Sequence, residues 1–458
     1  MTRKIVSVAA MTKTKRRLTI LLAVLLILGG LGYFISGFMI NRALESKGIR
    51  KLLSGKTAKV LDCPAGYLPL ASHGLYVSSR GFLAQAAPPR ALTEMRASRL
   101  RARCNLAELW RAKWRIDALS VDHLQAAYGE AAAGKIDRSK FSAPELQPPD
   151  KKDSPLDLDI RVLNVARTDL FWGSTPEIGG EFRGVRASFF PKDKNLAVHG
   201  NGGTFQQGKW PVAQMQQFKL FYAKPELRID EAELTFGGAS TISVLGNFKF
   251  EEKQSMDLQL TFARCPIAPF LGKNKPPKLE GEFQGTAHLQ KDASHAENVR
   301  AVGSIAVAQA VLKNVEALQN VAAFTGRGEL ARLPVTRLKA DYEWNSPALT
   351  VKNFVIESND LVILTGEFVV TDGKVAGEFQ LGAIPELVEK FPGAREEVFT
   401  RSADGYLWTA LTLSGTADKL RDNLRPRLVR AASNHFAKGI LAPIFKPGKT
   451  IIQAIEEL

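Results

Sequence analysis

Apolar and polar residues alternate over many short runs of this sequence, and this period of two limits the possible folds more than any other feature. The clearest case is GEFVVTDGKVAGEFQLG at residues 366–382. Two alternating runs flank an Asp-Gly pair there, and Asp-Gly favours a two-residue hairpin turn. Because successive side chains of a strand point to opposite faces, each run predicts one apolar and one polar face. The sequence therefore predicts a mainly β protein with antiparallel pairing.

Alternating runs begin near residues 156, 256, 279 and 375. Within each run the apolar side chains fall on one side of the predicted strand, and acidic or amide side chains fall mostly on the other. Segments with helical spacing are too few to cover so many strands, so the apolar faces need another partner. The residues that we expect to line an apolar surface are Leu158, Ile160, Val162, Leu258, Leu260, Phe262, Leu279, Phe283, Val375, Phe379 and Leu381.

A loose internal repeat supports a meander of successive hairpins. PELRIDEAEL, from Pro225, matches PALTVKNFVI, from Pro347, in its apolar positions. About twenty residues after each proline, a glycine and an apolar pair precede a turn, in LGNFKFEEK and TGEFVVTDGK. Two copies of one meander indicate a sheet that grows by the addition of strands.

Three stretches have helical character. KGIRKLLSG, from Lys47, predicts a short helix, and residues 307–324 have helical apolar spacing. The segment from Asp418 has leucines four residues apart beside arginines, which predicts a basic amphipathic helix that Pro426 kinks or restarts. Such a helix lies on a membrane or a partner, or packs across the end of the sheet.

Residues 18–40 carry no charge and are mostly apolar. As a helix they would span about 34 Å, which matches the hydrocarbon core of a bilayer. A buried helix and a cleaved signal peptide are the alternatives, but the stretch is long for a signal peptide and no convincing cleavage site follows it. We therefore expect a transmembrane anchor from Leu18 to Ile40.

Basic residues stand on both sides of this anchor, so their count does not settle its orientation. A short cationic tail resists translocation, whereas a long domain crosses largely regardless of charge. We therefore expect residues 1–17 in the cytoplasm and the bulk of the chain on the other side. The membrane-proximal basic residues of the tail are Lys13, Lys15, Arg16 and Arg17.

The expected organisation follows from these features together with a proline-rich charged linker at residues 144–155. The predicted sections are a cytoplasmic tail (1–17), the anchor (18–40), a first α/β section (41–143) with a strand, a helical turn and a strand, the linker (144–155), a β-meander (156–306), a helical insert (307–330), a second β section (331–415) and an amphipathic helical tail (416–458).

The chain is basic, with 62 Lys and Arg against 46 Asp and Glu and a net charge of +16. Nucleic acid and anionic lipid are both possible reasons for such an excess. The densest cationic run, between Arg90 and Arg115, largely alternates cations with other residues, as one wet face of a strand does. We therefore favour a solvated face or contact with lipid headgroups, and we expect no nucleic-acid partner.

The sequence contains no recognisable catalytic or cofactor motif. Its six histidines lack metal-ligand spacing, its three cysteines are dispersed without a C-x-x-C pair, and its glycine-rich turns lack the lysine of a phosphate loop. The pair Asp157 and Asp159 fits the wet face of a strand better than a calcium site. We therefore expect no catalytic residues, no metal and no cofactor, and we expect that the protein is not an enzyme.

Two segments of the sequence resemble a known protein family. LRARCNLAELWRAKWRIDALSVDHLQAAYG behind the anchor looks like the strand, short helix and strand of AsmA-like proteins, and residues 334–382 are similar to their carboxy-terminal region. The resemblance covers most of residues 18–415 and rests on apolar spacing and glycines. This chain is short for the family.

The resemblance implies a bacterial inner-membrane protein, single-pass and with its amino terminus in the cytoplasm. Its periplasmic part would be an elongated, curled antiparallel sheet with an open hydrophobic groove and a few short helices. Such proteins are linked to phospholipid movement and envelope integrity, and are grouped with bridge-like lipid transfer proteins. The family offers no catalytic residues, so the implied role of the apolar residues given above is to line the groove.

Three functions remain open. The leading one is a lipid-holding or lipid-conducting groove, whose partners would be phospholipid or another acyl lipid and the inner membrane. The second is a non-catalytic envelope assembly factor, whose apolar faces close into a sandwich or bind an envelope protein. The third is an envelope hydrolase with a site that the sequence does not reveal.

Overall fold

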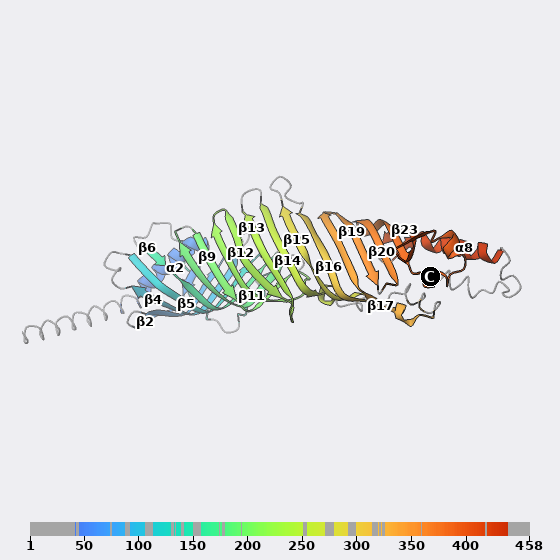
Figure 1. Ribbon diagram of the computed structural model, residues 1–458. Coiled ribbons are helices and arrows are strands. Elements are labelled where there is room, and N and C mark those ends of the chain that lie inside the picture. The colour runs from blue at the N-terminus through green and yellow to red at the C-terminus, as the bar shows by residue number, and fades with distance from the viewer. Residues whose placement is uncertain are drawn as a thin grey trace, which may run out of the picture. The chain divides into compact units, whose positions relative to one another are not determined.

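The structure is a computed structural model. It describes residues 42, 45–73, 76–87, 92–105, 113–129, 132, 134–138, 142–149, 157–173, 175, 179–193, 195–250, 254–270, 279–291, 299–313, 319, 322, 326–358, 360–416 and 419–437. The chain divides into two compact units, residues 1–192 (unit 1) and residues 193–458 (unit 2). Both units consist mainly of strands with a few short helices, as the alternation predicts (Figure 1).

Unit 1 is built on three long antiparallel strands, β3, β4 and β5. Strands β1 and β2 both pair with β3, and β8 pairs with β7. The elements are α2 (Lys47–Leu61), β1 (Ala65–Tyr67), β2 (Leu70–His73), β3 (Tyr76–Gln85), β4 (Leu92–Asn105), β5 (Lys113–Tyr128), β6 (Asp157–Ile160), β7 (Leu163–Trp172) and β8 (Gly180–Lys192).

Helix α2 covers one face of this sheet. The hydroxyl of Ser46 accepts a hydrogen bond from the N–H of Ile49 at 3.3 Å and so caps the first turn. Ala58 of the helix is fully buried against Phe82 and Ala84 of β3 in the main core cluster of the unit. The predicted helix from Lys47 is therefore confirmed, and it continues to Leu61.

The run at residues 156–162 differs from its prediction. Strand β6 ends at Ile160, and Val162 lies between β6 and β7. Both strands pair with β5 in parallel, whereas the alternation was interpreted as antiparallel. Alternation is the same in the two kinds of pairing, so the direction of a neighbouring strand cannot be predicted from it.

Unit 2 is a succession of antiparallel strands. Its elements are β9 (Asn195–Asn201), β10 (Thr204–Gln207), β11 (Ala213–Ala223), β12 (Glu226–Thr235), β13 (Thr241–Lys249), β14 (Ser255–Pro266), η1 (Ala268–Phe270), β15 (Leu279–Lys291), β16 (Val299–Lys313), η2 (Gly328–Ala331), β17 (Arg332–Val335), β18 (Arg337–Asn345), β19 (Ala348–Ser358), β20 (Val362–Thr371), β21 (Lys374–Ala383), α6 (Pro385–Val388), α7 (Ala394–Glu397), β22 (Arg401–Ala403), β23 (Tyr406–Thr416), β24 (Lys419–Asp422) and α8 (Leu424–Ala437).

From β11 to β16 each strand pairs with the next, and the series continues through β18, β19, β20, β21 and β23 (Figure 1). The predicted hairpin at Asp372-Gly373 joins β20 to β21, with Thr371 paired to Lys374. Asp372 and Gly373 have φ values of 50° and 74°. Positive φ at both positions is what a two-residue type I′ turn requires.

The two copies of the internal repeat each contain a shift of strand register at the same place. Strand β12 shifts register after Ile229, four residues beyond Pro225, and β19 shifts after Val351, four residues beyond Pro347. Bulges bend a strand and increase its local twist. The two copies therefore share a bent strand as well as an apolar pattern.

Two helix predictions need correction. Residues 307–313 continue strand β16 and pair with β15, β17 and β18, so the predicted helical insert does not begin at Val307. At the carboxy-terminal end, residues 419–422 form β24, and helix α8 begins only at Leu424. Pro426 stands in the first turn of α8, where a missing N–H costs no hydrogen bond, so it neither kinks nor interrupts the helix.

The carboxy-terminal end of unit 2 has a closed core. Helices α6, α7 and α8 contribute buried Leu387, Ala394 and Ala431, which pack with Leu407 of β23. The guanidinium of Arg427 on α8 donates hydrogen bonds to the carbonyl of Ala410 (2.7 Å), the carbonyl of Val398 (3.1 Å) and the hydroxyl of Thr409 (2.8 Å). These bonds attach α8 to the free edge of β23.

Candidate functional site

Strand register brings most of the predicted lining residues of unit 2 onto one face, which we call the apolar face. One row of directly paired residues joins two of them, Phe283 and Leu381, across six strands. Every member of this row is apolar. The row consists of Phe283, Val307, Leu338, Ile356, Leu364 and Leu381.

A second row joins Leu258 to Val375 on the same face. All seven of its members are apolar as well, and they belong to strands β14, β15, β16, β18, β19, β20 and β21. The row consists of Leu258, Leu289, Ala301, Trp344, Leu349, Val370 and Val375. With strands about 4.8 Å apart, its six steps correspond to roughly 29 Å of continuous apolar surface.

Most side chains of the apolar face are only half-buried. Leu258 and Phe379 are 8% and 5% exposed, whereas Trp344 is 38% exposed. The other predicted lining residues of unit 2 are in the intermediate range: Leu260, Phe262, Leu279, Phe283, Val375 and Leu381. These side chains pack laterally against their neighbours, and part of their surface stays accessible.

Aromatic rings fill the apolar face beside small residues. The rings of Phe354, Phe368 and Phe379 form one cluster, with centroid separations of 5.8–6.1 Å. A second cluster contains Phe262 and Phe283, whose ring centroids are 5.6 Å apart. Such pairs contribute about 0.5–1.5 kcal/mol beyond the area that they bury.

Among the described residues, local segments cover parts of the apolar face. Phe270 of η1 lies edge-on to the ring of Phe283 with centroids 5.5 Å apart. Near it Ile267, Val307 and Val335 form a buried cluster, since β17 pairs with the end of β16. At the β21 end of the face, Ala383 belongs to the core cluster that contains Ala431 of helix α8, and Leu381 packs against this cluster. Within the described residues, no helix of eight or more residues joins the cluster around Ile267 and Val307.

Three predicted lining residues do not belong to this surface. Ile160 and Val162 lie in unit 1 and are half-buried. Leu158 belongs to β6, also in unit 1, and its side chain lies outside the described part of the structure. Spacing within a strand could not reveal that this run belongs to a different unit.

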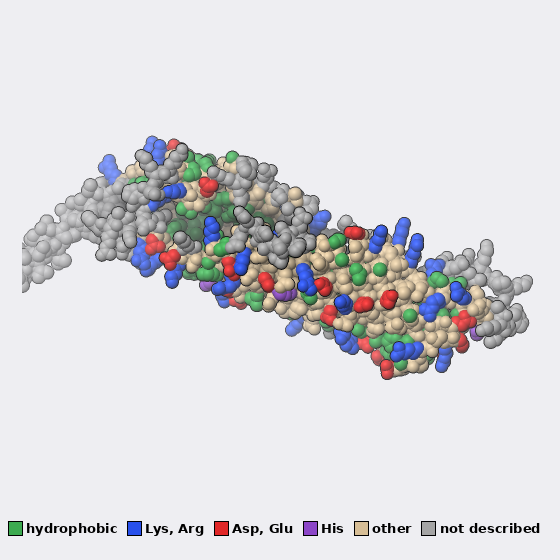
Figure 2. All heavy atoms as spheres, turned by 90° about the horizontal axis from the view of Figure 1, so that it is seen from above, with side chains coloured by type: hydrophobic (Ala, Val, Ile, Leu, Met, Phe, Trp, Pro, Cys, Tyr) green, Lys and Arg blue, Asp and Glu red, His purple; other side chains and the backbone are tan. Residues whose placement is uncertain are grey.

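The opposite face of unit 2 is polar and carries ion pairs between neighbouring strands. Lys219 and Glu231 are 2.7 Å apart, and Arg300 and Glu343 are 2.8 Å apart. A hydrogen bond from His288 lowers the pKa of the Asp257 carboxyl, although the little burial of this group opposes the shift. Basic and acidic side chains are likewise interspersed over the face seen in Figure 2.

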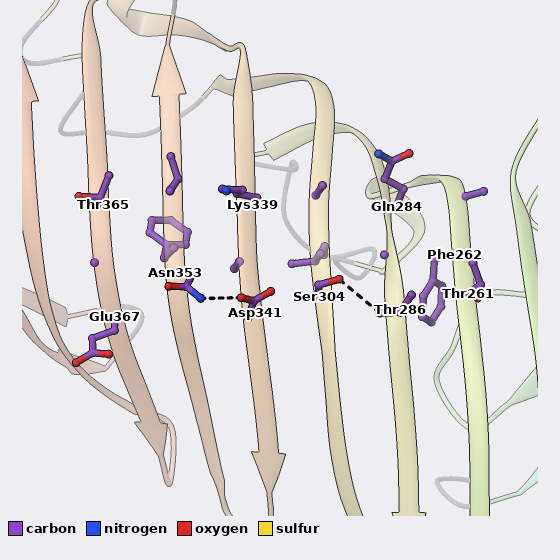
Figure 3. Close-up of a pocket in the computed structure, with 18 residues that line it drawn as sticks. Thr261, Phe262, Gln284, Thr286, Ser304, Lys339, Asp341, Asn353, Thr365 and Glu367 are labelled. Carbon is purple, nitrogen blue, oxygen red and sulfur yellow. Dashed lines mark hydrogen bonds between the residues drawn. The ribbon is translucent and has the colours of Figure 1, made fainter. Parts of the chain in front are cut away.

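A hollow of about 1040 Å³ crosses strands β14–β20, and both polar side chains and residues of the apolar face, among them Phe262, Ile305 and Phe354, line it. Its labelled side chains lie at two levels (Figure 3). Gln284, Lys339 and Thr365 form one level. They belong to one row of directly paired residues, in which Ala306 lies between Gln284 and Lys339, and Val355 lies between Lys339 and Thr365. The other level contains Thr261, Thr286, Ser304, Asp341, Asn353 and Glu367.

Hydrogen bonds within the hollow link neighbouring strands. The amide of Asn353 donates to Asp341 at 2.8 Å, and the hydroxyls of Thr286 and Ser304 are 3.4 Å apart. Asn353 has a φ of 51°, the left-handed conformation that asparagine tolerates better than most residues. Sequence reasoning missed this hollow because it depends on the register of six strands. Its lining combines hydroxyl, amide and charged groups with aromatic and aliphatic side chains, so it offers both hydrogen bonds and apolar contacts.

The described residues show no group of three or more metal-binding side chains that could hold an ion. Cys63, Cys104 and Cys265 form no disulfide. Burial, together with the charge of Asp117, raises the pKa of Cys104 to about 11. A thiol with this pKa is protonated at neutral pH and is a poor nucleophile.

The predicted anchor, Leu18–Ile40, and the basic residues Lys13, Lys15, Arg16 and Arg17 lie outside the described residues. In the part of the chain that is described, no helix is both long enough and apolar enough to cross a bilayer.

Comparison with known proteins gives no match for this chain among family models, curated proteins or solved structures. The resemblance to AsmA-like proteins therefore stays a prediction from the sequence.

Proposed function

We propose that the apolar face of unit 2 holds or conducts phospholipid or another acyl lipid, and that the protein serves envelope biogenesis from a bacterial inner membrane. The observation that carries the proposal is the pair of apolar rows that join Phe283 to Leu381 and Leu258 to Val375. Continuous apolar surface of this extent is unusual on a soluble protein without a binding partner.

An acyl chain fits such a surface better than a compact ligand does. Burial of each methylene contributes about 0.8 kcal/mol, without any need for directional contacts. The rows offer apolar contacts across successive strands. Long apolar chains with a polar head would therefore be stabilised along the rows, in an open groove formed by the curled sheet.

The location belongs to the same proposal. Residues 18–40 would anchor the chain, with residues 1–17 in the cytoplasm and the rest of the chain in the periplasm. With only residues 41–458 in the periplasm, the apolar face would lie where lipid leaving the inner membrane could reach it. The resemblance to AsmA-like proteins supports it.

Photocrosslinking in cells tests the proposal. A photoreactive residue at Phe262, Phe283 or Phe379 should form adducts with acyl lipid, because each belongs to the apolar face. Thr261 and Gln284 are matched control positions, since each is adjacent in sequence to a test position and points to the opposite, polar face of its strand. These controls should give no lipid adduct.

The competing function, an envelope assembly factor, predicts a different result. If the apolar face binds a protein, crosslinks from Phe262, Phe283 and Phe379 should all give protein adducts and none should contain lipid. That pattern would contradict the lipid proposal.

A further inference from the structure

A second hollow, of about 900 Å³, lies in unit 1 on strands β3, β4 and β5. Its lining contains three arginines but only one carboxylate. The side chains that matter here are Ser78, Arg80, Arg99, Arg101, Ser120 and Asp122. Part of the cationic run that stands out in the sequence therefore lines a concave surface.

Strand register places a hydroxyl on each side of Arg101. Arg101 pairs with Ser78 on β3 and with Ser120 on β5. Side chains of directly paired residues are about 5 Å apart at Cβ, so both hydroxyls are close to a ligand that the guanidinium binds. The guanidinium also lies 4.3 Å from the ring centroid of Tyr76. This stacking restricts the orientation of Arg101 and prepares it for binding.

Arg99 stands at an irregularity in the middle of β4. Its φ is 49°, and neither neighbouring strand pairs with it. Its Nε lies 2.7 Å from Oδ2 of Asp122. A left-handed conformation at a residue other than glycine is uncommon, and such outliers concentrate at functional sites. This unusual backbone conformation therefore lies in β4, the strand of the hollow that carries both Arg99 and Arg101.

The charges in the hollow do not balance. Asp122 offsets one arginine, with which it already forms an ion pair, and two guanidinium charges remain. Guanidinium groups match the geometry of phosphate oxygens, and the hydroxyl of Ser120 can donate a further hydrogen bond. The hydroxyl of Ser78 donates to the carbonyl of Ala71 at 3.3 Å. We propose that this hollow binds a phosphate-type oxyanion, carried by free phosphate or by the phosphate of a lipid headgroup. The site is in unit 1 and does not depend on what covers the apolar face of unit 2.

Binding measurements on the full chain in nonionic detergent micelles test the site. Isothermal titration calorimetry with inorganic phosphate examines the free ion, and mixed micelles with and without phosphatidic acid examine the headgroup. Arg101→Gln should weaken binding about tenfold, because it removes charge-assisted hydrogen bonds. Arg103→Gln is the matched control, since Arg103 is an exposed cation two residues further along β4 and outside the hollow. It should change the affinity by less than about twofold.

The source of the oxyanion follows from the probe that binds. Binding of inorganic phosphate that Arg101→Gln weakens would identify the free ion. Binding only of micelles that contain phosphatidic acid, with the same sensitivity, would identify the headgroup. Arg101→Lys keeps the charge but loses the planar fork, so its affinity should lie between those of the wild type and Arg101→Gln. Equal losses for Arg101→Gln and Arg103→Gln, or no binding of either probe by the wild type, would overturn the proposal.

Discussion

Glycines on the apolar face of unit 2 let aromatic side chains lie directly over the backbone. A Cβ added at Gly366 would meet the carbonyl of Glu378 and would lie 2.8 Å from a ring carbon of Phe379. The hydroxyl of Tyr342 similarly crosses Gly303 and donates to the carbonyl of Thr286 at 3.0 Å. Absence of a side chain at these glycines is therefore a packing requirement.

We predict that Gly366→Ala lowers the free energy of unfolding by about 1–3 kcal/mol, because the backbone of β21 or the ring of Phe379 would have to move. Gly328→Ala is the matched control, since no atom lies within 4 Å of its added Cβ and its φ is not positive. The control should stay within about 0.5 kcal/mol of the wild type. Urea unfolding followed by circular dichroism measures both, and equal effects would contradict this packing.

At single residues, sequence spacing predicted which side chains share a face of one strand. It could not predict which residues of different strands become neighbours. Leu258 and Val375 are 117 positions apart, and only the pairings of the strands between them reveal that they belong to one row. The hollow across β14–β20 and the hollow that Arg101 lines were missed for the same reason.

Individual elements show where local pattern fails. Residues 307–313 are rich in alanine and valine, which fit a strand as well as a helix. Pairing with β15 and β18 fixes them as a strand, so tertiary contacts override the helical spacing. Hairpins with an Asp-Gly turn were predictable because the turn chemistry is local, as at Asp372-Gly373.

At the carboxy-terminal edge of unit 2, side chains bond to the backbone of the edge strand β23. Strands β22 and β24 pair only with the two ends of β23. Between them, Arg427 bonds to Ala410 and Thr409, and the side chain of Asn423 accepts a hydrogen bond from the N–H of Thr412 at 2.9 Å. An edge satisfied in this way offers fewer groups for pairing with another strand.

We predict that Arg427→Ala destabilises unit 2 by about 1–3 kcal/mol, because the buried carbonyl of Val398 and the buried hydroxyl of Thr409 lose their donor. The variant should also self-associate more readily, since the middle of β23 becomes available for strand pairing. Arg430→Ala, one helical turn further along α8 and exposed, should change little. Urea unfolding and analytical ultracentrifugation measure the two effects. Identical behaviour of the two variants would show that Arg427 does not close this edge.

At the scale of the whole molecule, the two units differ in how far their apolar faces are covered. In unit 1, helix α2 covers the apolar face, and Phe82 is 4% exposed. In unit 2, the described helices gather at the carboxy-terminal end, and the apolar face along β13–β21 keeps half-buried side chains. The central claim is that an acyl lipid supplies the missing cover of this face.

Mass spectrometry of lipid extracted from the purified full chain tests this claim most directly. The wild type should carry phospholipid, and Leu260→Asp should lose most of it, because a carboxylate on the half-buried apolar face opposes acyl chains. Gln259→Asp, on the polar face of the same strand, controls for the added charge and for lipid retained around the anchor, and should keep the wild-type amount. Circular dichroism should show that both variants stay folded. Lipid-free wild type, or equal lipid in the two variants, would contradict the account.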